Sequence, residues 1–187
     1  GEIIGLAGLG GHGQTEALLD LYLARNSSWL PTRKTDIAFV AGDRSLNGTF
    51  PLWSILGNLS IRELPHLARG GVIDRAAEAE LGRQWHERVA IRTPDLSNNI
   101  LSLSGGNQQK VLLARWLVQE PRIYMFDEPT HGVDVGAKTQ IHDVIHEVAD
   151  AGACAIVITS EVEEMFALAD RILVLRDGAF VGEMRRR

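Results

Sequence analysis

The sequence predicts an α/β fold in which helices pack on a parallel β-sheet. Helical and extended patterns alternate along the chain, which is typical of parallel sheets. The clearest helix spans residues 137–152, where apolar side chains recur at helical spacing and Gly152 marks the end. Five short apolar runs, rich in β-branched residues, are predicted strands: Ile3–Ala7, Ile37–Ala41, Ile123–Phe126, Ala155–Thr159 and Ile172–Leu175.

Residues 58–99 interrupt this alternation. No run in that stretch carries a strong strand signal, and "RAAEAELGRQWHERVAI" (75–91) reads as a helix in its composition. We therefore expect a helical insertion within one domain, and 187 residues suffice to build such a domain with a sizeable core.

Composition and charge narrow the possible functions. The chain has 24 acidic and 19 basic residues and a formal net charge of -5, which argues against a nucleic-acid partner. The single cysteine, Cys154, excludes an internal disulfide and lies in an apolar run typical of a buried structural thiol. No apolar run approaches the roughly 18 residues that a membrane-spanning helix needs.

The stretch "GLGGHGQTE" (Gly8–Glu16) lies where the first strand turns into a helix. Glycines at such a turn let main-chain N–H groups surround phosphate oxygens, and a hydroxyl such as that of Thr15 can hold Mg²⁺. The lysine that spans the outer phosphates in such loops is replaced by Gln14. A phosphate loop and a simple tight connection are both compatible with this stretch alone.

The stretch "IYMFDE" (Ile123–Glu128) delivers two carboxylates at the carboxyl end of a predicted buried strand. Ligands of α/β sheets bind at that edge. Asp127 is placed to coordinate Mg²⁺, and Glu128 is placed to polarise an attacking water. The alternative is an acidic residue that caps a helix or a turn.

The stretch "LSLSGGNQQK" (residues 101–110) opens a helix with one serine and two glycines. The hydroxyl of Ser104 and the bare N–H groups of Gly105 and Gly106 make this helix end a second candidate anion site. A serine N-cap is the simpler alternative, but it leaves the double glycine unexplained.

Here the sequence resembles a known family. "LSGGNQQK" (Leu103–Lys110) resembles the signature motif of ATP-binding cassette (ABC) transporter ATPases, and its "NQQK" ending resembles the monosaccharide-importer branch. "FDEPTHGVDVGAK", "ITSEVEEMFALADRILVLRDG" and "FVAGDRSLNGTFPLWSILGNL" resemble other motifs of that branch, so that the resemblance covers nearly the whole chain. Two departures are His131, where an arginine is more usual, and Gly42, where an acidic residue is usual.

The resemblance implies a P-loop NTPase core with an inserted α-helical subdomain. Residues 1–187 would then form a single ABC ATPase domain fragment, with 1–57 and 101–187 as a RecA-like core and about 58–100 as the helical subdomain. A full cassette begins with additional strands before Gly1, and the segment between Leu23 and Ile37 is shorter than usual. The N-terminal β layer is therefore expected to be missing or reduced.

The resemblance also implies the cofactors ATP and Mg²⁺ and the residues that hold them. Thr15 and Asp127 would hold the metal, while Glu128 and Ser160 would occupy the catalytic positions. Residues expected to contact nucleotide are Gly8, Gly10, Gly11, Gly13, Gln14, Thr15, Glu16, Leu103, Ser104, Gly105, Gly106, Asn107, Gln108 and Asp134.

ABC ATPases hold each nucleotide between the P-loop of one cassette and the signature helix of the other. Sugar importers of this type carry two cassettes in one polypeptide, and the second often has a degenerate P-loop. Gln14 in place of lysine and Ser160 in place of the switch histidine match that second cassette. The implied partners are another cassette (in the same polypeptide or a second copy), membrane permease subunits and, indirectly, a periplasmic or extracellular sugar-binding protein. The implied location is the cytoplasmic face of the bacterial inner membrane.

Other interpretations stay open at this point. A nucleoside importer of the same branch shares most of the motifs, a non-transport ABC protein is a different class, and a non-hydrolysing regulatory module is a third. His142 and His146 have a spacing that zinc enzymes use, but solvated or rim histidines are the expected interpretation. Trp53 is either a permease contact or ordinary packing, and Asp134 is either a dimer contact or a helix N-cap.

Overall fold

The central sheet places the predicted strands side by side in parallel. The computed structural model describes residues 1–9, 13–24, 36–42 and 48–186. Within these ranges one sheet has six strands in the order β2-β5-β6-β1-β7-β8. Their bounds are β1 Ile3–Ala7, β2 Ile37–Val40, β5 Ile123–Asp127, β6 Cys154–Ile158, β7 Arg171–Arg176 and β8 Ala179–Arg185. The five predicted strands are confirmed, and they pair in parallel with one another.

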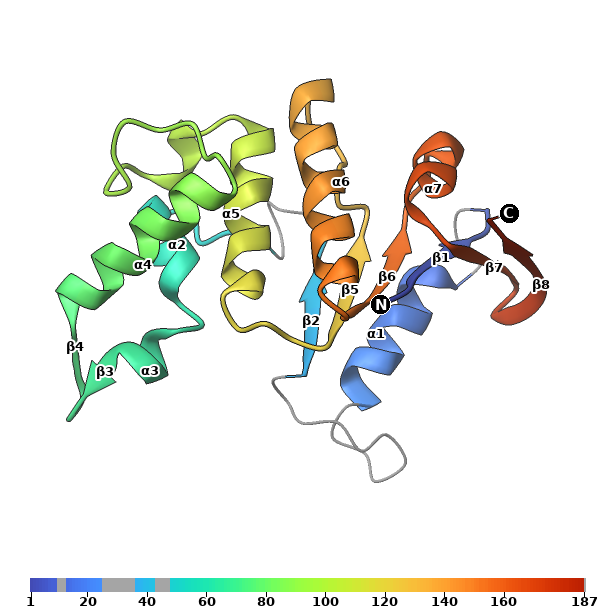
Figure 1. Ribbon diagram of the computed structural model, residues 1–187, viewed down its shortest axis with the longest axis horizontal. Helices are drawn as coiled ribbons and strands as arrows, with labels where there is room; N and C mark the ends of the chain where they lie inside the picture. Colours follow the sequence, from blue (N-terminus) through green and yellow to red (C-terminus); the bar gives the residue numbers. More distant parts are fainter. Residues whose placement is uncertain (10–12, 25–35, 43–47, 187) are drawn as a thin grey trace.

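Helices cover both faces of this sheet (Figure 1). Helix α1 (Gln14–Ala24) packs on one face, where its buried Leu18 meets Leu6 of β1 and Met125 of β5. Helices α5 (Gly105–Leu117) and α6 (Val135–Asp150) pack on the other face around Phe126. Because strand side chains alternate between faces, Met125 and Phe126 belong to opposite cores.

The inserted stretch is helical except for one short hairpin. It contains α2 (Ile55–Ser60), α3 (Leu64–Leu67) and α4 (Arg75–Arg88), followed by a 3₁₀ turn, Ile100–Ser102. Between α3 and α4 the two-residue strands β3 (Ala68–Arg69) and β4 (Val72–Ile73) pair in antiparallel fashion. Gly70 and Gly71 form the turn with φ of +58° and +82°. The expectation of a purely helical insertion missed this hairpin, although a Gly-Gly pair is a known hairpin signal.

Strand β8 was not predicted either. It pairs antiparallel with β7 at the edge of the sheet, and every residue in it is exposed. Asp177 and Gly178 make the connecting turn with φ of +52° and +76°. The expected shortening of the segment between Leu23 and Ile37 falls almost wholly on residues outside the described ranges.

The register brings the ends of three neighbouring strands to one edge. Gly5 of β1 pairs with Val157 of β6, and Asp127 of β5 pairs with Ile158 of β6. The segments that begin at Gly8, Glu128 and Thr159 therefore leave the sheet together. In the part of the chain that is described, no helix has the length and apolar character to cross a bilayer.

Candidate functional site

The side chain of Gln14 is turned back onto the loop that precedes it. Its amide nitrogen donates a hydrogen bond to the main-chain oxygen of Leu9 at 3.2 Å, and the side chain is buried. A Cβ at Gly8 would lie 2.4 Å from that nitrogen, so the glycine makes room for the amide. Gly13, just before the helix, has φ of +97°, a conformation suited to glycine. Gly10 and Gly11 lie outside the described residues.

Thr15 and Asp127 meet at this edge of the sheet. The hydroxyl of Thr15 donates to the Asp127 carboxylate at 3.4 Å. Burial raises the pKa of Asp127; the bond from Thr15 opposes this shift, and the negative charge of the exposed Glu16 adds to it. A half-buried carboxylate beside a hydroxyl is an oxygen-only pair, which is the ligand type that Mg²⁺ prefers.

Glu128 lies just beyond Asp127 in a strained backbone conformation. Its φ of +48° is unusual for a residue with a side chain and is stabilised by a bond from its N–H to the oxygen of Ile158 at 2.9 Å. Burial raises the pKa of the Glu128 carboxyl, while hydrogen bonds from Ser160 partly offset the shift. The Ser160 hydroxyl lies 3.3 Å from the Glu128 carboxylate. The structure thus brings the two predicted catalytic residues together.

Gly42 follows β2 and packs against the same two acidic residues. A Cβ at Gly42 would lie 2.7 Å from the main-chain oxygen of Asp127 and 2.9 Å from the Cβ of Glu128. Cβ atoms essentially never approach another atom below 3.0 Å. Any side chain at this position would therefore collide with the strand end that carries Asp127 and Glu128 unless that strand end moved.

The tip of α5 is capped by Ser104, as one interpretation of the sequence predicted. The Ser104 hydroxyl accepts hydrogen bonds from the main-chain N–H of Asn107 at 3.5 Å and from its side chain at 2.9 Å. The Gln108 side chain donates to the oxygen of Leu103 at 3.0 Å, while Asn107 accepts from the N–H of Arg92. These bonds fix the geometry of the tip and leave Ser104 itself exposed.

The tip of α5 lies against the start of α6. A Cβ at Gly106 would lie 2.6 Å from the Cβ of Ala137 and 3.3 Å from the Asp134 carboxylate. Asp134 caps α6 by accepting from the N–H of Ala137 at 2.9 Å, and that bond lowers the pKa of Asp134. The predicted residues thus form two groups, one around Thr15 and Glu128 and the other around Ser104 and Asp134.

Comparisons with known proteins identify the family. The family described as ABC transporter matches residues 1–131. The chain belongs to the ABC transporter family. Solved structures agree on the fold: the dimeric, post-hydrolysis structure of the ATP-binding cassette MJ0796 bound to ADP and Pi superposes with a TM-score of 0.81. That match has 21% identity and covers 100% of this chain and 86% of the other.

Relatives of this ABC protein are named for sugar import. The ribose import ATP-binding protein RbsA 1 of Burkholderia ambifaria is 40% identical over 98% of this chain and 38% of its own length. The xylose import ATP-binding protein XylG of Geobacillus kaustophilus is 36% identical over 100% of this chain and 40% of its own length. The ABC chain thus spans about two fifths of the length of these relatives.

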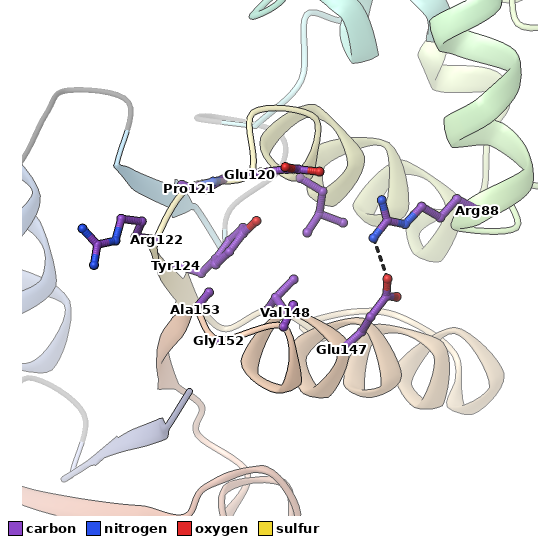
Figure 2. A pocket seen from close by; sticks show the side chains of 11 residues that line it. Arg88, Glu120, Pro121, Arg122, Tyr124, Glu147, Val148, Gly152 and Ala153 are labelled. Atoms are coloured by element: carbon purple, nitrogen blue, oxygen red, sulfur yellow. Dashed lines mark hydrogen bonds and ion pairs between the residues drawn. The ribbon is translucent and has the colours of Figure 1, made fainter.

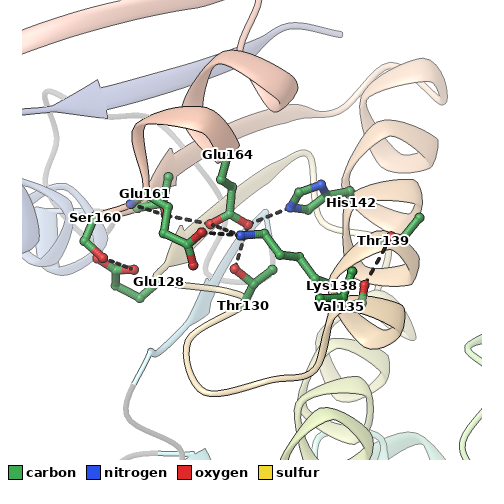
Figure 3. Close-up of polar contacts among 10 residues, drawn as sticks. Glu128, Thr130, Val135, Lys138, Thr139, His142, Ser160, Glu161 and Glu164 are labelled. Atoms are coloured by element: carbon green, nitrogen blue, oxygen red, sulfur yellow. Dashed lines mark hydrogen bonds and ion pairs between the residues drawn. The ribbon is translucent and has the colours of Figure 1, made fainter.

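A buried carboxylate that the sequence did not single out organises the ABC cassette beside Ser160 (Figure 3). Glu164 accepts hydrogen bonds from the hydroxyls of Thr130 and Thr159, each at 2.6 Å, and its carboxylate lies 2.6 Å from Nε2 of His142. Burial alone would raise the pKa of Glu164, but the bonds from His142, Thr130 and Thr159 and the charge of Lys138 lower it to about 2.

This network distinguishes the two alternatives expected for His142. Its side chain is 18% exposed and is bonded to a buried acid, which agrees with a histidine at the rim of the core and not with a solvated one. Among the described residues, no group of three or more His, Cys, Asp or Glu side chains could hold a metal ion. The sequence around His142 could not reveal its bond to Glu164, because the two residues lie 22 positions apart and the i, i+4 spacing to His146 is unrelated to this bond.

Of two cavities among the described residues, one is lined by predicted site residues and the other is not. One of about 520 Å³ lies between α1, β2 and α5 and is lined by Thr15, Asp127 and Arg115. Another of about 420 Å³ lies at the amino end of β5, where Tyr124 lines it and the Arg88–Glu147 ion pair joins α4 to α6 (Figure 2). The second cavity is lined by none of the predicted site residues and is separate from the edge where Thr15 and Asp127 meet.

Proposed function

We propose that this cassette binds Mg-ATP and powers the import of a monosaccharide through a membrane permease. The relatives named for ribose and xylose import support the substrate class, and the family match supports ATP as the energy source. We further propose that the cassette is the weaker half of an asymmetric pair. Its own P-loop binds the outer phosphates poorly, and its α5 tip completes the ATP site of the partner cassette.

The observation that carries this proposal is the contrast between Gln14 and the α5 tip. The side-chain amide of Gln14 donates its hydrogen bond to the oxygen of Leu9 and brings no positive charge to the loop. A hydrogen bond to a charged group contributes about 1.5–3 kcal/mol, so its loss weakens phosphate binding by roughly one to two orders of magnitude. The tip of α5 keeps an exposed hydroxyl and a glycine pair. One site has lost its cation while the other retains its donors.

The residues at the P-loop edge fit Mg²⁺. Thr15 and Asp127 offer oxygen ligands from two elements, and the half-buried Asp127 carboxylate carries a charge that a cation would compensate. When bound, Mg²⁺ would neutralise phosphate charge. Glu128, whose pKa is raised by burial, has the basicity to accept a proton from water, and Ser160 holds its carboxylate in place. Hydrolysis at this edge would then be slow rather than absent.

The α5 tip and the Asp134 loop form the proposed face toward the partner cassette. Ser104 and the N–H groups of Gly105 and Gly106 would donate to a terminal phosphate bound by the partner. The two groups of site residues are on separate elements, as a sandwiched nucleotide requires. The dimeric structure of MJ0796 supports the pairing of cassettes.

We propose that the apolar segment before α2 contacts the permease on the cytoplasmic face of the inner membrane. Leu52 is 90% exposed, while Phe50 and Trp53 stack on each other with ring centroids 4.9 Å apart and remain partly exposed. Clustered exposed apolar side chains mark interaction sites. In this proposal about residues 58–100 act as the helical subdomain. A sugar-binding protein outside the membrane delivers the sugar to the permease.

The test compares two substitutions in the complete two-cassette protein with its permease. Ser104→Arg places a bulky cation where the partner's phosphate should lie, and we expect ATP turnover to fall at least about 100-fold, as when a donor to a reacting oxygen is removed. Gln14→Ala should leave turnover within about threefold, because the retained main-chain donors do most of the binding there. Equal losses from both substitutions would refute the asymmetric pair.

Gln14 and Ser160 together favour a second candidate, a nucleotide-binding module that regulates without hydrolysis. This module would bind Mg-ATP and close the dimer, and it would later release the ATP without hydrolysing it. Glu128→Gln separates the two candidates. If the cassette hydrolyses ATP at its own site, the substitution lowers the residual turnover of a protein whose partner site is inactivated; a regulatory module shows no residual turnover to lose.

A further inference from the structure

Arg115 is a buried cation on α5, and its hydrogen bonds join this helix to the segment of residues 48–58. Only 8% of the residue is exposed. Its Nε donates to the oxygen of Asn58 at 2.6 Å, one terminal nitrogen donates to the oxygen of Gly48 at 2.6 Å, and the other donates to the Asn58 side-chain oxygen at 3.0 Å. Burial, with the nearby Arg62 as a second cause, lowers the pKa of Arg115 to about 10.

Asn58 is fully buried and continues this connection to the exposed apolar segment. Its side-chain oxygen accepts from the N–H of Phe50 at 2.8 Å, and its side-chain nitrogen donates to the oxygens of Phe50 and Ser54, both at 3.0 Å. The same side-chain oxygen thus receives donors from Phe50 and from Arg115. The guanidinium and the amide hold the segment at residues 48, 50, 54 and 58.

The flat, fixed fork of arginine suits this place. The guanidinium presents several N–H donors in one plane, and its described hydrogen-bond acceptors here are all oxygens of one short segment. A lysine would bring the same charge but only one nitrogen, which cannot reach the oxygens of Gly48 and Asn58 in the same geometry. The connection therefore depends on the shape of the side chain as well as on its charge.

Helix α5 places this connection and the α5 tip on one rigid body. The helix begins after Ser104 and is continuous to Leu117, so a displacement of its tip moves Arg115 with it. Beyond the connection lie Phe50, Leu52 and Trp53, which are exposed. A movement of the α5 tip can therefore reach the exposed Phe50–Trp53 segment through the hydrogen bonds of Arg115 and Asn58.

We propose that Arg115 and Asn58 are positioning residues that carry the movement of α5 to the Phe50–Trp53 segment, so that closure on nucleotide is felt by the permease. This inference rests on the proposed function, because it takes that segment as the permease contact. Arg115 acts through Asn58 and Phe50.

The test uses Arg115→Lys, with Arg62→Lys as the matched control. Arg62 also links this region to α5, since it donates to Gln119 and stacks over Trp116 at 3.6 Å, but it lies beyond α2 and not on the Phe50–Trp53 segment. In the complete transporter, reconstituted in vesicles, we measure sugar transported per ATP hydrolysed. We expect this ratio to fall at least about fivefold in Arg115→Lys, the lower end of ordinary coupling strengths, and to stay constant in Arg62→Lys.

A second measurement reports on the connection itself. In Arg115→Lys, hydrogen exchange at the Phe50 amide should quicken by about tenfold, the effect of losing a hydrogen bond to a charged group, while exchange at Phe126 stays constant. A purely structural role would lower the amount of active protein and leave the transport ratio unchanged. An unchanged ratio therefore overturns the inference whatever the exchange shows. If the wild-type transporter hydrolyses ATP without moving sugar, the proposed function is wrong. The wild-type measurement therefore distinguishes a failure of the proposed function from a failure of the inference about Arg115.

Discussion

The side-chain amide of Gln14 lies 3.2 Å from the main-chain oxygen of Leu9 and donates a hydrogen bond to it. The side chain of Gln14 therefore stabilises the loop at the start of α1. The space beside Gly8 accommodates this amide. Gln14 favours the folded loop, whereas a lysine at this position would favour a bound phosphate, and this contrast leads to the first prediction.

Gln14→Lys should strengthen ATP binding to the cassette. The substitution supplies a positive charge to the phosphate loop and removes the bond to Leu9. We expect the dissociation constant for Mg-ATP to fall by about 10- to 100-fold, and the thermal midpoint without nucleotide to drop slightly. Titration calorimetry and thermal unfolding measure the two effects.

Gln14→Met serves as the control for this substitution. It has a similar length and no charge, so it should lose the bond to Leu9 without any gain in affinity. If lysine and methionine gave the same affinity, charge would not be what the loop lacks, and the proposed weak site would need another cause.

Asp127→Asn should abolish the stabilisation of the cassette by Mg²⁺ with ATP. The neutral amide can still accept the bond from Thr15, so the fold is retained, but it carries no charge to compensate a cation. Ligand binding raises the unfolding free energy by about 2.7 kcal/mol at 100 times the dissociation constant. We expect that gain for the wild type and almost none for the variant.

EDTA provides the internal comparison for Asp127. Chelation of Mg²⁺ should bring the wild type down to the variant's midpoint and leave the variant unchanged. A variant that still responded fully to Mg²⁺ would show that Asp127 does not hold the metal.

Glu164→Gln should destabilise the cassette at neutral pH, and the loss should vanish in acid. A pKa of about 2, against an ordinary 4.5, corresponds to about 3 kcal/mol of stability. Because the folded-state pKa is lowered, this contribution is present above pH 4.5 and is lost as the pH falls from 4.5 toward 2. Denaturant unfolding at a series of pH values measures the difference between wild type and variant.

The control for Glu164 is Glu161→Gln. Glu161 pairs with the same Lys138 at 2.6 Å but is largely exposed, so its pair should contribute under about 1 kcal/mol. A difference between wild type and Glu164→Gln that stayed constant from neutral pH down to pH 2 would mean that the carboxylate charge is not what stabilises this network.

The sequence was most informative where the signal is local. Each buried strand is an apolar run, so the runs that end at Ala7 and Phe126 could be located without the structure. Asp127 and Glu128 follow such a run directly, Thr15 follows the other after the glycine-rich turn, and the parallel sheet brings them together. Strand β8 carried a local signal as well, the Asp177-Gly178 turn, but its exposed residues lack the apolar character on which the strand prediction relied.

The networks could not be predicted because their partners are distant in sequence. Glu164 bonds to Thr130 across 34 residues, and Arg115 bonds to Asn58 across 57. Such contacts depend on which face of a helix meets which strand end, and a helical pattern fixes a face without naming its partner. The turned-back orientation of Gln14 was equally hidden, since a glutamine can reach out as easily as fold back.

Gly42 gives the last prediction, because it opposes what the family pattern suggests. An acidic residue is usual there in the family, so the family pattern alone predicts that an acidic substitution improves the site. In this fold a Cβ would meet the oxygen of Asp127 at 2.7 Å and the Cβ of Glu128 at 2.9 Å. Gly42→Ala should therefore cost about 1–3 kcal/mol of unfolding free energy, as overpacking does, and Gly42→Glu at least as much. Gly182→Ala is the control, since its nearest atoms lie 3.9 Å away. Denaturant unfolding separates the two sites, and a tolerated Gly42→Ala would mean that the strand end carrying Asp127 and Glu128 can move aside.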